Sequence, residues 1–323
     1  MAMDLLGTAG MSNGMKQFYS RDLLERTIPL TLFLRFADRK TGIPRNQGRS
    51  LEWRRYERAV TSVSPTALTE GTPPSETQLT ISNVQATVNQ YGAFTRHSEV
   101  LDLQNYDPYI GSVTEQYAEH MALTLDTVVR NIIVAGTTVQ YVAGKGSRGD
   151  IGATTGDRIS YAEIREIVST LRGNNVPPVE DGKFIGVMHP HTEYDLFADS
   201  DVLTSFQNAY ERGRSNPIVA GEVKDFHGVR WFVTTQARIF GSLGLSGADV
   251  YSTLVFGRQA YAAVDYAAMG ARVIVKPVGS AGALDPLSQM GTVGWKAAMA
   301  AAILDQNRIV RLEHTADLGD EGV

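Results

Sequence analysis

The stretch PYIGSVTEQYAEHMALTLDTVVRNIIVAG, residues 108–136, carries the clearest hydrophobic pattern of the chain. Its apolar side chains recur every three or four residues, at Ile110, Val113, Tyr117, Met121, Leu125, Val128 and Ile132. This spacing predicts one amphipathic helix over residues 108–135, with Asp107 as N-cap, Pro108 in the first turn and Gly136 after its end. At ~1.5 Å per residue such a helix is about 40 Å long, which suits a structural spine. On the opposite face, Asp126 and Arg130 are spaced to pair.

A long hairpin is predicted before this helix. Residues 50–60 form one strand candidate and residues 78–94 form a second. Between them lies a polar segment with three prolines, residues 61–77. The two strands hold few large apolar residues for their length, and such a hairpin is marginal on its own. We therefore expect it to lie against something else, as an arm would in an assembly.

The chain after the helix mixes helices and strands. Ser160 and Glu163 form a capping-box pattern that opens a helix closed by Gly173. Short helices are expected over residues 192–197 and 202–212. Strands are predicted at residues 184–188, 229–234, 251–256, 272–277, 292–303 and 308–313. No regular alternation of strand and helix is present, so the fold class is α+β rather than a doubly wound parallel sheet.

Composition excludes several kinds of chemistry. The 323 residues are 43% hydrophobic, enough for a sizeable core, and include no cysteine. Disulfides, cysteine zinc sites and thiol nucleophiles are therefore excluded. No run approaches the ~20 apolar residues that span a bilayer, and the first residues lack a secretory pattern. We therefore expect no membrane association, and synthesis in the cytoplasm of the producing cell.

Charge is distributed unevenly along the chain. The net charge is −5, yet residues 1–58 contain 11 Lys and Arg against 6 Asp and Glu. This basic segment could associate with the acidic body of a neighbouring copy, or bind nucleic acid, or simply solvate an exposed strand. Trp53 and Tyr56 among Arg54, Arg55 and Arg58 suit a protein interface better than a site for single-stranded nucleic acid.

No motif indicates an enzyme or a cofactor site. His189-Pro190-His191, with Glu193 and Asp195 nearby, lacks a third ligand at a known spacing and is interpreted as a turn or helix start. The glycine-rich run AGKGSRGDIG lacks the phosphate-binding lysine pattern of a P-loop. The G-x-S-x-G match at Ser12 has neither the strand nor the helix of a nucleophile elbow. The predicted catalytic residues, metal ligands and cofactors are therefore none.

Long segments of the chain resemble one protein family. They are VIVKPVGSAGALDPLSQMGTVGWKAAMAAAIL (residues 273–304), QYGAFTRHSEVLDLQNYDP (residues 90–108), LTLDTVVRNIIVAGTTVQYVAGK and GVMHPHTEYDLFAD. Taken in order, they are similar to the major capsid proteins typified by coliphage N-four. The resemblance extends over roughly residues 31–314.

The resemblance implies the Johnson fold of tailed-phage capsid proteins. Residues 1–49 would be an N-terminal arm and residues 50–95 an extended loop hairpin. Residues 96–140 with 266–304 would form a peripheral domain around the spine helix. Residues 141–265 with 305–323 would form an axial domain and C-terminal tail, with Arg308–Glu313 closing its sheet. Trp295 belongs to the core of this arrangement rather than to its surface.

The implied function is self-assembly into the icosahedral head of a tailed phage. The chain would form pentamers and hexamers, with scaffolding, portal and cement or decoration proteins as further partners. It would meet packaged double-stranded DNA non-specifically, in a virion assembled in the host bacterial cytoplasm. As contacts between subunits we predict hairpin residues reaching the acidic spine helix of a neighbour: Trp53, Arg54, Arg55, Tyr56 and Arg58 against Glu115, Glu119 and Asp126.

Three other functions remain open from the sequence. An encapsulin-like compartment shares the implied fold but encloses protein cargo. A soluble α+β enzyme with an unrecognised site would form small oligomers rather than shells. A nucleic-acid binder would use the basic N-terminal segment, and its affinity would fall steeply with salt.

Overall fold

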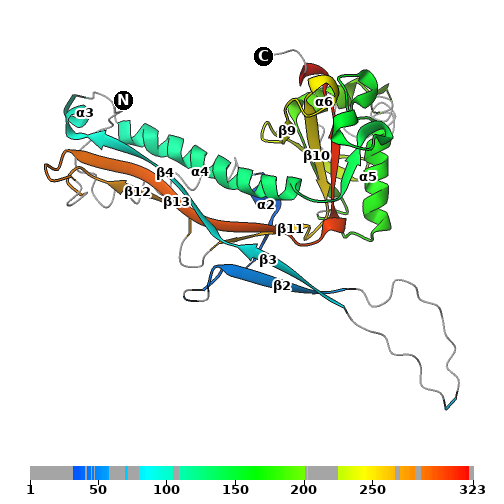
Figure 1. Ribbon diagram of the computed structural model, residues 1–323, viewed down its shortest axis with the longest axis horizontal. Helices are drawn as coiled ribbons and strands as arrows, with labels where there is room; N and C mark the ends of the chain where they lie inside the picture. The colour runs from blue at the N-terminus through cyan, green and yellow to red at the C-terminus, as the bar shows by residue number, and fades with distance from the viewer. Residues whose placement is uncertain are drawn as a thin grey trace.

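Two β-sheets and a long helix form the body of the molecule, and a two-stranded hairpin projects from it (Figure 1). The computed structural model describes residues 32–40, 42–44, 46, 48–57, 70–71, 80–104, 109–179, 181–200, 202, 225–265, 270–280 and 285–319. Within these residues, no helix is both long and apolar enough to span a membrane.

The first sheet has five strands arranged around one long strand. Strand β13 (Met290–Ile303) pairs with β4 (Asn89–Ser98) along one edge. Its other edge pairs with β12 (Arg272–Lys276) and then with β11 (Tyr261–Asp265), which is joined in parallel by the short β1 (Asp38–Arg39). The strands predicted at residues 272–277 and 292–303 are both present, and they are neighbours in this sheet.

The second sheet has seven strands in the order β5-β14-β10-β6-β8-β7, with β9 on an end of β10. Their bounds are β5 Val139–Tyr141, β6 Phe184–Met188, β7 Asp225–Phe226, β8 Val229–Val233, β9 Ile239–Phe240, β10 Val250–Phe256 and β14 Ile309–His314. The central strands β6, β10 and β14 are buried at every residue. The strand predicted at residues 308–313 is β14 of this sheet, whereas the one predicted at residues 292–303 is β13 of the other.

Helices cover these sheets in two layers. Helix α4 (Tyr109–Val134) lies along the five-stranded sheet, with α2 (Phe33–Phe36) beside it and α3 (Glu99–Gln104) beyond its N-terminal end. Helices α5 (Tyr161–Gly173) and α6 (Pro190–Ala198) cover one face of the seven-stranded sheet. Short 3-10 turns occur at Val142–Gly144, Arg148–Asp150, Thr155–Asp157, Leu245–Gly247, Gln306–Arg308 and Asp317–Gly319.

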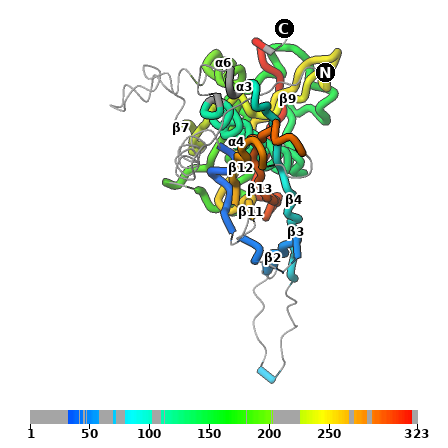
Figure 2. Tube along the Cα trace, turned by 90° about the vertical axis from the view of Figure 1, so that its left-hand side faces the viewer, coloured from blue at the N-terminus to red at the C-terminus, as the bar shows by residue number. Residues whose placement is uncertain are grey.

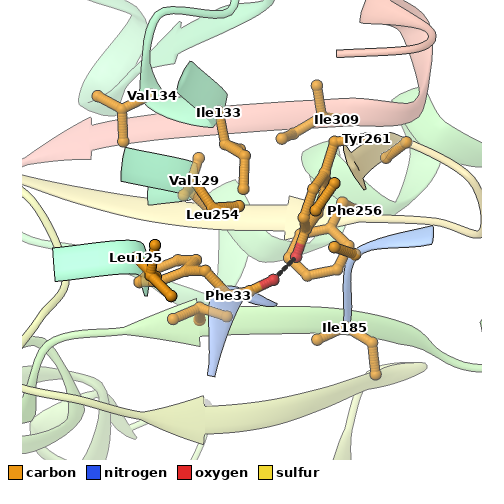
Figure 3. Packing of buried hydrophobic residues seen from close by; sticks show 14 of the residues in the cluster. Phe33, Leu125, Val129, Ile133, Val134, Ile185, Leu254, Phe256, Tyr261 and Ile309 are labelled. Atoms are coloured by element: carbon orange, nitrogen blue, oxygen red, sulfur yellow. Dashed lines mark hydrogen bonds between the residues drawn. The ribbon is translucent and has the colours of Figure 1, made fainter. Parts of the chain in front are cut away.

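One hydrophobic cluster joins the two sheets (Figure 3). Leu125, Val129 and Ile133 of α4 meet Phe256 of the seven-stranded sheet and Tyr261 of the five-stranded sheet. The buried Tyr261 hydroxyl donates a hydrogen bond of 2.7 Å to the carbonyl oxygen of Phe33, which fixes α2 in the same cluster. Because burying side chains of this size contributes ~1.5–3 kcal/mol each, the cluster holds the two sheets together as one body.

The helix and capping predictions are largely confirmed. Helix α4 matches the predicted residues 108–135 to within one residue at each end, while Asp107 and Pro108 lie outside the described residues. The capping box at Ser160 is present at the start of α5. The apolar stripe, however, runs through Val129 and Ile133 rather than Val128 and Ile132, because α2 and β10 pack against that side of the helix.

Two predicted domain boundaries do not coincide with the sheets. Strand β4 runs unbroken across the boundary at residue 95 and pairs with β13 over its whole length. Strand β11 belongs to the five-stranded sheet although the boundary at residue 265 would assign it to the other unit. The projecting hairpin therefore ends at Thr87. Of the predicted helix at residues 202–212 the structure describes residue 202 alone, and the arm before residue 32 lies outside the described residues.

Candidate assembly surfaces

The projecting hairpin consists of β2 (Ser50–Tyr56) and β3 (Ile81–Thr87), paired antiparallel from Ser50 opposite Thr87 to Tyr56 opposite Ile81. Along β2, half-buried and exposed residues alternate strictly, which is the pattern of a strand with one covered face. Figure 2 shows the pair leaving the body below both sheets. One face of the hairpin is therefore covered and the other is exposed.

The inner face attaches the hairpin to its own subunit. Trp53, Leu51 and Val84 pack on a row of small residues of β13, at Ala298, Ala300 and Ala302. The Trp53 ring is thus half-buried within the chain, which leaves it less available to a neighbour than predicted.

Arg55 also works within the subunit. Its guanidinium donates to the carbonyl oxygen of Leu304 at 3.0 Å and lies 3.1 Å from a carboxylate oxygen of Asp305. The same group pairs with Glu57, and that hydrogen bond raises the pKa of Arg55. Residues 304–305 connect β13 of one sheet to β14 of the other, so Arg55 ties the hairpin to the junction of the body. Arg55 is therefore engaged within its own subunit, and its contact with a neighbour stays a prediction.

The outer face of the hairpin is open. Arg54 is exposed, with its Nε 3.9 Å from a carboxylate oxygen of Glu52. Tyr56 is 73% exposed and lies directly opposite Ile81, which is 50% exposed. A large exposed aromatic paired with an exposed aliphatic residue is typical of an interaction surface. Of the predicted hairpin contacts, Arg54 and Tyr56 are therefore placed outward, whereas Arg58 lies outside the described residues.

The spine helix offers fewer acidic groups than predicted. Glu119 is exposed and Glu115 is half-buried. Asp126 is only 1% exposed, and one carboxylate oxygen accepts the backbone N–H of Leu34 at 2.9 Å. Burial raises the pKa of Asp126.

Asp126 is therefore engaged within its own subunit, where its carboxylate holds α2, and its contact with a neighbour stays a prediction. Its predicted partner Arg130 instead donates to the carbonyl oxygen of Gln236 at 2.7 Å.

The motifs rejected as metal or catalytic sites have structural uses. His189 is the N-cap of α6, and its Nδ1 accepts the backbone N–H of His191, which confirms the predicted helix start. Arg148 of the glycine-rich loop donates two hydrogen bonds of 2.7 Å to the buried carboxylate of Glu313. In the part of the chain that the structure describes, no group of three or more His, Asp or Glu side chains is arranged to bind a metal ion.

Sequence reasoning missed a basic groove on the five-stranded sheet. It has a volume of about 530 Å³ and is lined by residues of three strands: Gln90, Tyr91, Gly92, Ala93, Phe94, Ile274, Lys276, Thr292, Gly294, Trp295 and Lys296. The strands come from distant parts of the chain, so no local spacing could have grouped these residues. The excess of Lys and Arg over acidic residues in residues 272–296 was the one available signal.

The profile of a family described as phage capsid protein matches residues 82–312, which is well over half of the chain. No curated protein sequence matches significantly.

Solved phage capsids have similar folds at low sequence identity. The capsid of cyanophage Pam1 aligns with a TM-score of 0.67 at 14% identity, over 98% of this chain and 97% of that chain. For the capsid of Ralstonia phage GP4 the values are 0.65 and 15%, over 89% and 88%. For the capsid of cyanophage P-SCSP1u they are 0.63 and 16%, over 85% and 89%. The chain therefore belongs to the phage capsid protein family, has the Johnson fold, and is a major capsid protein, the structural subunit of a phage head.

Proposed function

We propose that this capsid protein assembles with itself, in rings of five and of six, into an icosahedral head that encloses the double-stranded DNA of a tailed phage. The observation that carries the proposal is the family match over residues 82–312. The geometry supports it, because a body fixed by a shared core suits a shell tile and an outward-facing hairpin suits a link to the next tile. Closure of many such tiles multiplies contacts that are individually weak.

Each of the two sheets is proposed to form one domain of the capsid subunit. In this proposal the five-stranded sheet and α4 form the peripheral domain, and the seven-stranded sheet with α5 and α6 forms the axial domain near the ring centres. The β2–β3 hairpin is the extended loop. Scaffolding, portal and cement proteins would be further partners, and packaged DNA would be met through non-specific contacts. Assembly would take place in the cytoplasm of the host bacterium.

The outward row of the hairpin is proposed as one contact between subunits. Arg54 and Tyr56 are exposed there, and no element among the described residues covers them. Glu119, the exposed acid of the spine helix, is the proposed partner of Arg54, with Glu115 next to it by one helical turn. Charge pairs at such rims set register and partner choice more than affinity.

Electron microscopy of the purified full-length chain, with size-exclusion chromatography and scaffold where needed, tests the assembly. Uniform shells tens of nanometres across are the expected result. Particles recovered from infected or expressing cells should contain DNA and no enzyme cargo. A chain that stays monomeric or dimeric at high concentration and with scaffold contradicts the proposal, and shells filled with protein cargo would indicate an encapsulin-like compartment instead.

A charge swap tests the Arg54–Glu119 contact separately. Arg54→Glu and Glu119→Arg should each leave a folded chain with an unchanged melting temperature but reduce shell yield at least tenfold. The double variant should recover most of the yield, since opposite charges face each other again. Failure of the double variant to recover, while each single variant is defective, would exclude this pairing and leave assembly itself untouched.

A further inference from the structure

Three arginines surround one aromatic ring at the edge of the seven-stranded sheet. The ring is that of Phe240 on β9. The distances from its centroid to the guanidinium carbons are 3.5 Å for Arg148, 5.4 Å for Arg238 and 6.0 Å for Arg311. An aromatic face attracts a guanidinium and favours stacking of its plane on the ring. The ring therefore gathers three positive charges that come from separate segments of the chain.

A fourth arginine joins them from the long helix α4. Arg130 is half-buried and donates to the carbonyl oxygen of Gln236 at 2.7 Å, so it lies beside the turn that leads to Arg238. Burial lowers the pKa of Arg130, and the positive charge of Arg238 lowers it further. Both guanidinium groups still carry their charge at neutral pH, because arginine does not lose its proton in proteins. The two like charges therefore repel each other in the free subunit.

The acidic side chains beside this cluster do not neutralise it. Two of the four arginines share the buried carboxylate of Glu313. Asp126 acts on Arg130 by its charge, but burial raises the pKa of this carboxyl group. Among the ion pairs of the described residues, none includes Arg130 or Arg238. An anion from outside the subunit would thus be attracted by both guanidinium groups.

The residues next to these two arginines indicate which anion fits. Asn131 and Thr235 are exposed, and Gln236 is half-buried. A protein interface has apolar side chains at its centre, whereas phosphate groups of nucleic acids are bound by Arg, Thr, Asn and Gln side chains. The fork of a guanidinium also matches two oxygens of a phosphate. The composition therefore favours a phosphate ligand over an acidic protein segment.

On the basis of the proposed function, we propose that Arg130 and Arg238 form a binding site for phosphate groups of the packaged double-stranded DNA. The edge of the body at which α4 meets β9 then faces the genome. Contacts to phosphates carry no sequence information, so the same site can bind any stretch of the DNA. Each subunit adds few such contacts, and the many copies in a shell multiply them.

Binding of a labelled DNA duplex of about 20 base pairs to the unassembled full-length chain, measured by fluorescence anisotropy at several salt concentrations, tests the site. Arg130→Gln with Arg238→Gln should weaken binding by roughly tenfold at low salt. The slope of log affinity against log salt should become shallower by about 1.8, because each phosphate contact accounts for ~0.9. Arg238→Gln alone changes an exposed residue and should produce about half of this change in slope.

The matched control is Arg272→Gln with Lys276→Gln. These two cations are exposed on β12 of the other sheet, and no ion pair of the described residues includes them. The control removes the same charge and should keep the wild-type affinity to within about twofold. An equal loss from the control would mean that overall charge alone governs binding, and it would overturn the site. Wild-type affinity and slope in Arg238→Gln and in the double variant would overturn it as well.

A labelled poly-glutamate peptide distinguishes DNA from an acidic protein segment. A double variant that loses poly-glutamate binding but keeps duplex binding would exclude DNA as the ligand of this site. Melting temperatures of the unassembled chains show whether each variant is folded. If Arg130→Gln unfolds the chain because its bond to Gln236 is lost, the salt slope of Arg238→Gln alone decides the question.

Shell yield separates this site from the proposed function. Arg238→Gln should assemble as well as the wild type, because the site binds DNA rather than a second subunit. Normal shells from a variant that binds the duplex like the wild type would overturn the site and leave self-assembly standing. A wild-type chain that forms no shells would contradict the proposed function, whereas duplex binding is measured on the unassembled chain in either case.

Discussion

The body and the hairpin of this protein bury their residues in opposite ways. In the seven-stranded sheet, β6, β10 and β14 are buried along their whole length, whereas β2 alternates between half-buried and exposed residues and ends in an exposed Tyr56. The body therefore holds its shape from within. The hairpin has one covered face and one open face, and a two-stranded unit of this kind is marginal in water. The difference indicates that the body is stabilised by its own core, whereas the open face of the hairpin is suited to a contact with another subunit.

Polar side chains follow the same division. Glu313 is fully buried in the body, yet its carboxylate is satisfied by Arg148 at 2.7 Å and by Arg311 at 2.8 Å. Such a buried network costs desolvation and is retained where every member has a partner. On the hairpin, the ion pair that the described residues give Arg54 is with Glu52, at 3.9 Å. An arginine left open in this way is suited to a contact made between copies.

The largest difference between body and hairpin is expected when a core side chain is truncated. Phe256 is 1% exposed and packs edge-on against Tyr261, with ring centroids 5.3 Å apart. Phe256→Ala should lower the free energy of unfolding by about 3–5 kcal/mol, measured by urea denaturation of the unassembled chain. Tyr56→Ala, the matched aromatic truncation on the hairpin, should change it by less than about 0.5 kcal/mol. Similar losses from both variants would mean that the hairpin is part of the folded core.

Acid should weaken the body while sparing the hairpin. Burial lowers the pKa of His314 to about 4, and His97 and His189 are lowered to about 4 in the same way. The unfolded chain takes up these protons near pH 6.5, whereas the folded body resists them until about pH 4. Stability is thus fully present above pH 6.5 and falls as pH decreases toward 4, by an amount on the order of 3 kcal/mol for His314 alone.

Urea midpoints between pH 7 and pH 4.5 measure this loss. His314→Gln should give a flatter profile, because glutamine takes up no proton and retains a hydrogen-bonding group near Thr253. A profile as steep as that of the wild type would show that His314 does not contribute. Strands β2 and β3 contain no histidine, so the amide protection of the hairpin should not follow the same curve.

Arg54 and Arg55 allow the two faces of the hairpin to be compared within one strand. Arg55→Ala removes the tie to residues 304–305 and should lower the opening free energy of β2 and β3 by about 1 kcal/mol, since the guanidinium is partly exposed to solvent. Hydrogen exchange of the hairpin amides should then be roughly five times faster. Arg54→Ala should leave exchange unchanged in the unassembled chain. Equal effects of the two substitutions would contradict the assignment of opposite faces.

The sequence predicted the positions of helices and strands better than it predicted which of their faces are buried. The spacing from Ile110 to Leu125 located α4, and Ser160 with Glu163 located the start of α5, because both signals are local. Alternation also marked β2, but it did not say which side of that strand the body would cover, so Arg55 and Trp53 were assigned outward. The groove was missed because Phe94, Ile274 and Gly294 become neighbours only through pairing of distant strands.

Asp126 provides the smallest and most discriminating test. Its charge looked available on the spine helix, yet its carboxylate is buried and accepts the N–H of Leu34. Burial raises its pKa, so the ionised form is a cost to the fold at neutral pH. Asp126→Asn keeps an acceptor oxygen while removing the charge, and it should change the unfolding free energy by less than about 1 kcal/mol.

Shell yield from Asp126→Asn should equal that of the wild type, in contrast to the loss expected from Glu119→Arg. The two residues lie on the same helix, and only Glu119 is exposed. A clear assembly defect in Asp126→Asn with an unchanged melting temperature would return Asp126 to the contact surface. It would also mean that α2 moves aside when subunits meet, because in the single chain the carboxylate is buried and accepts the N–H of Leu34.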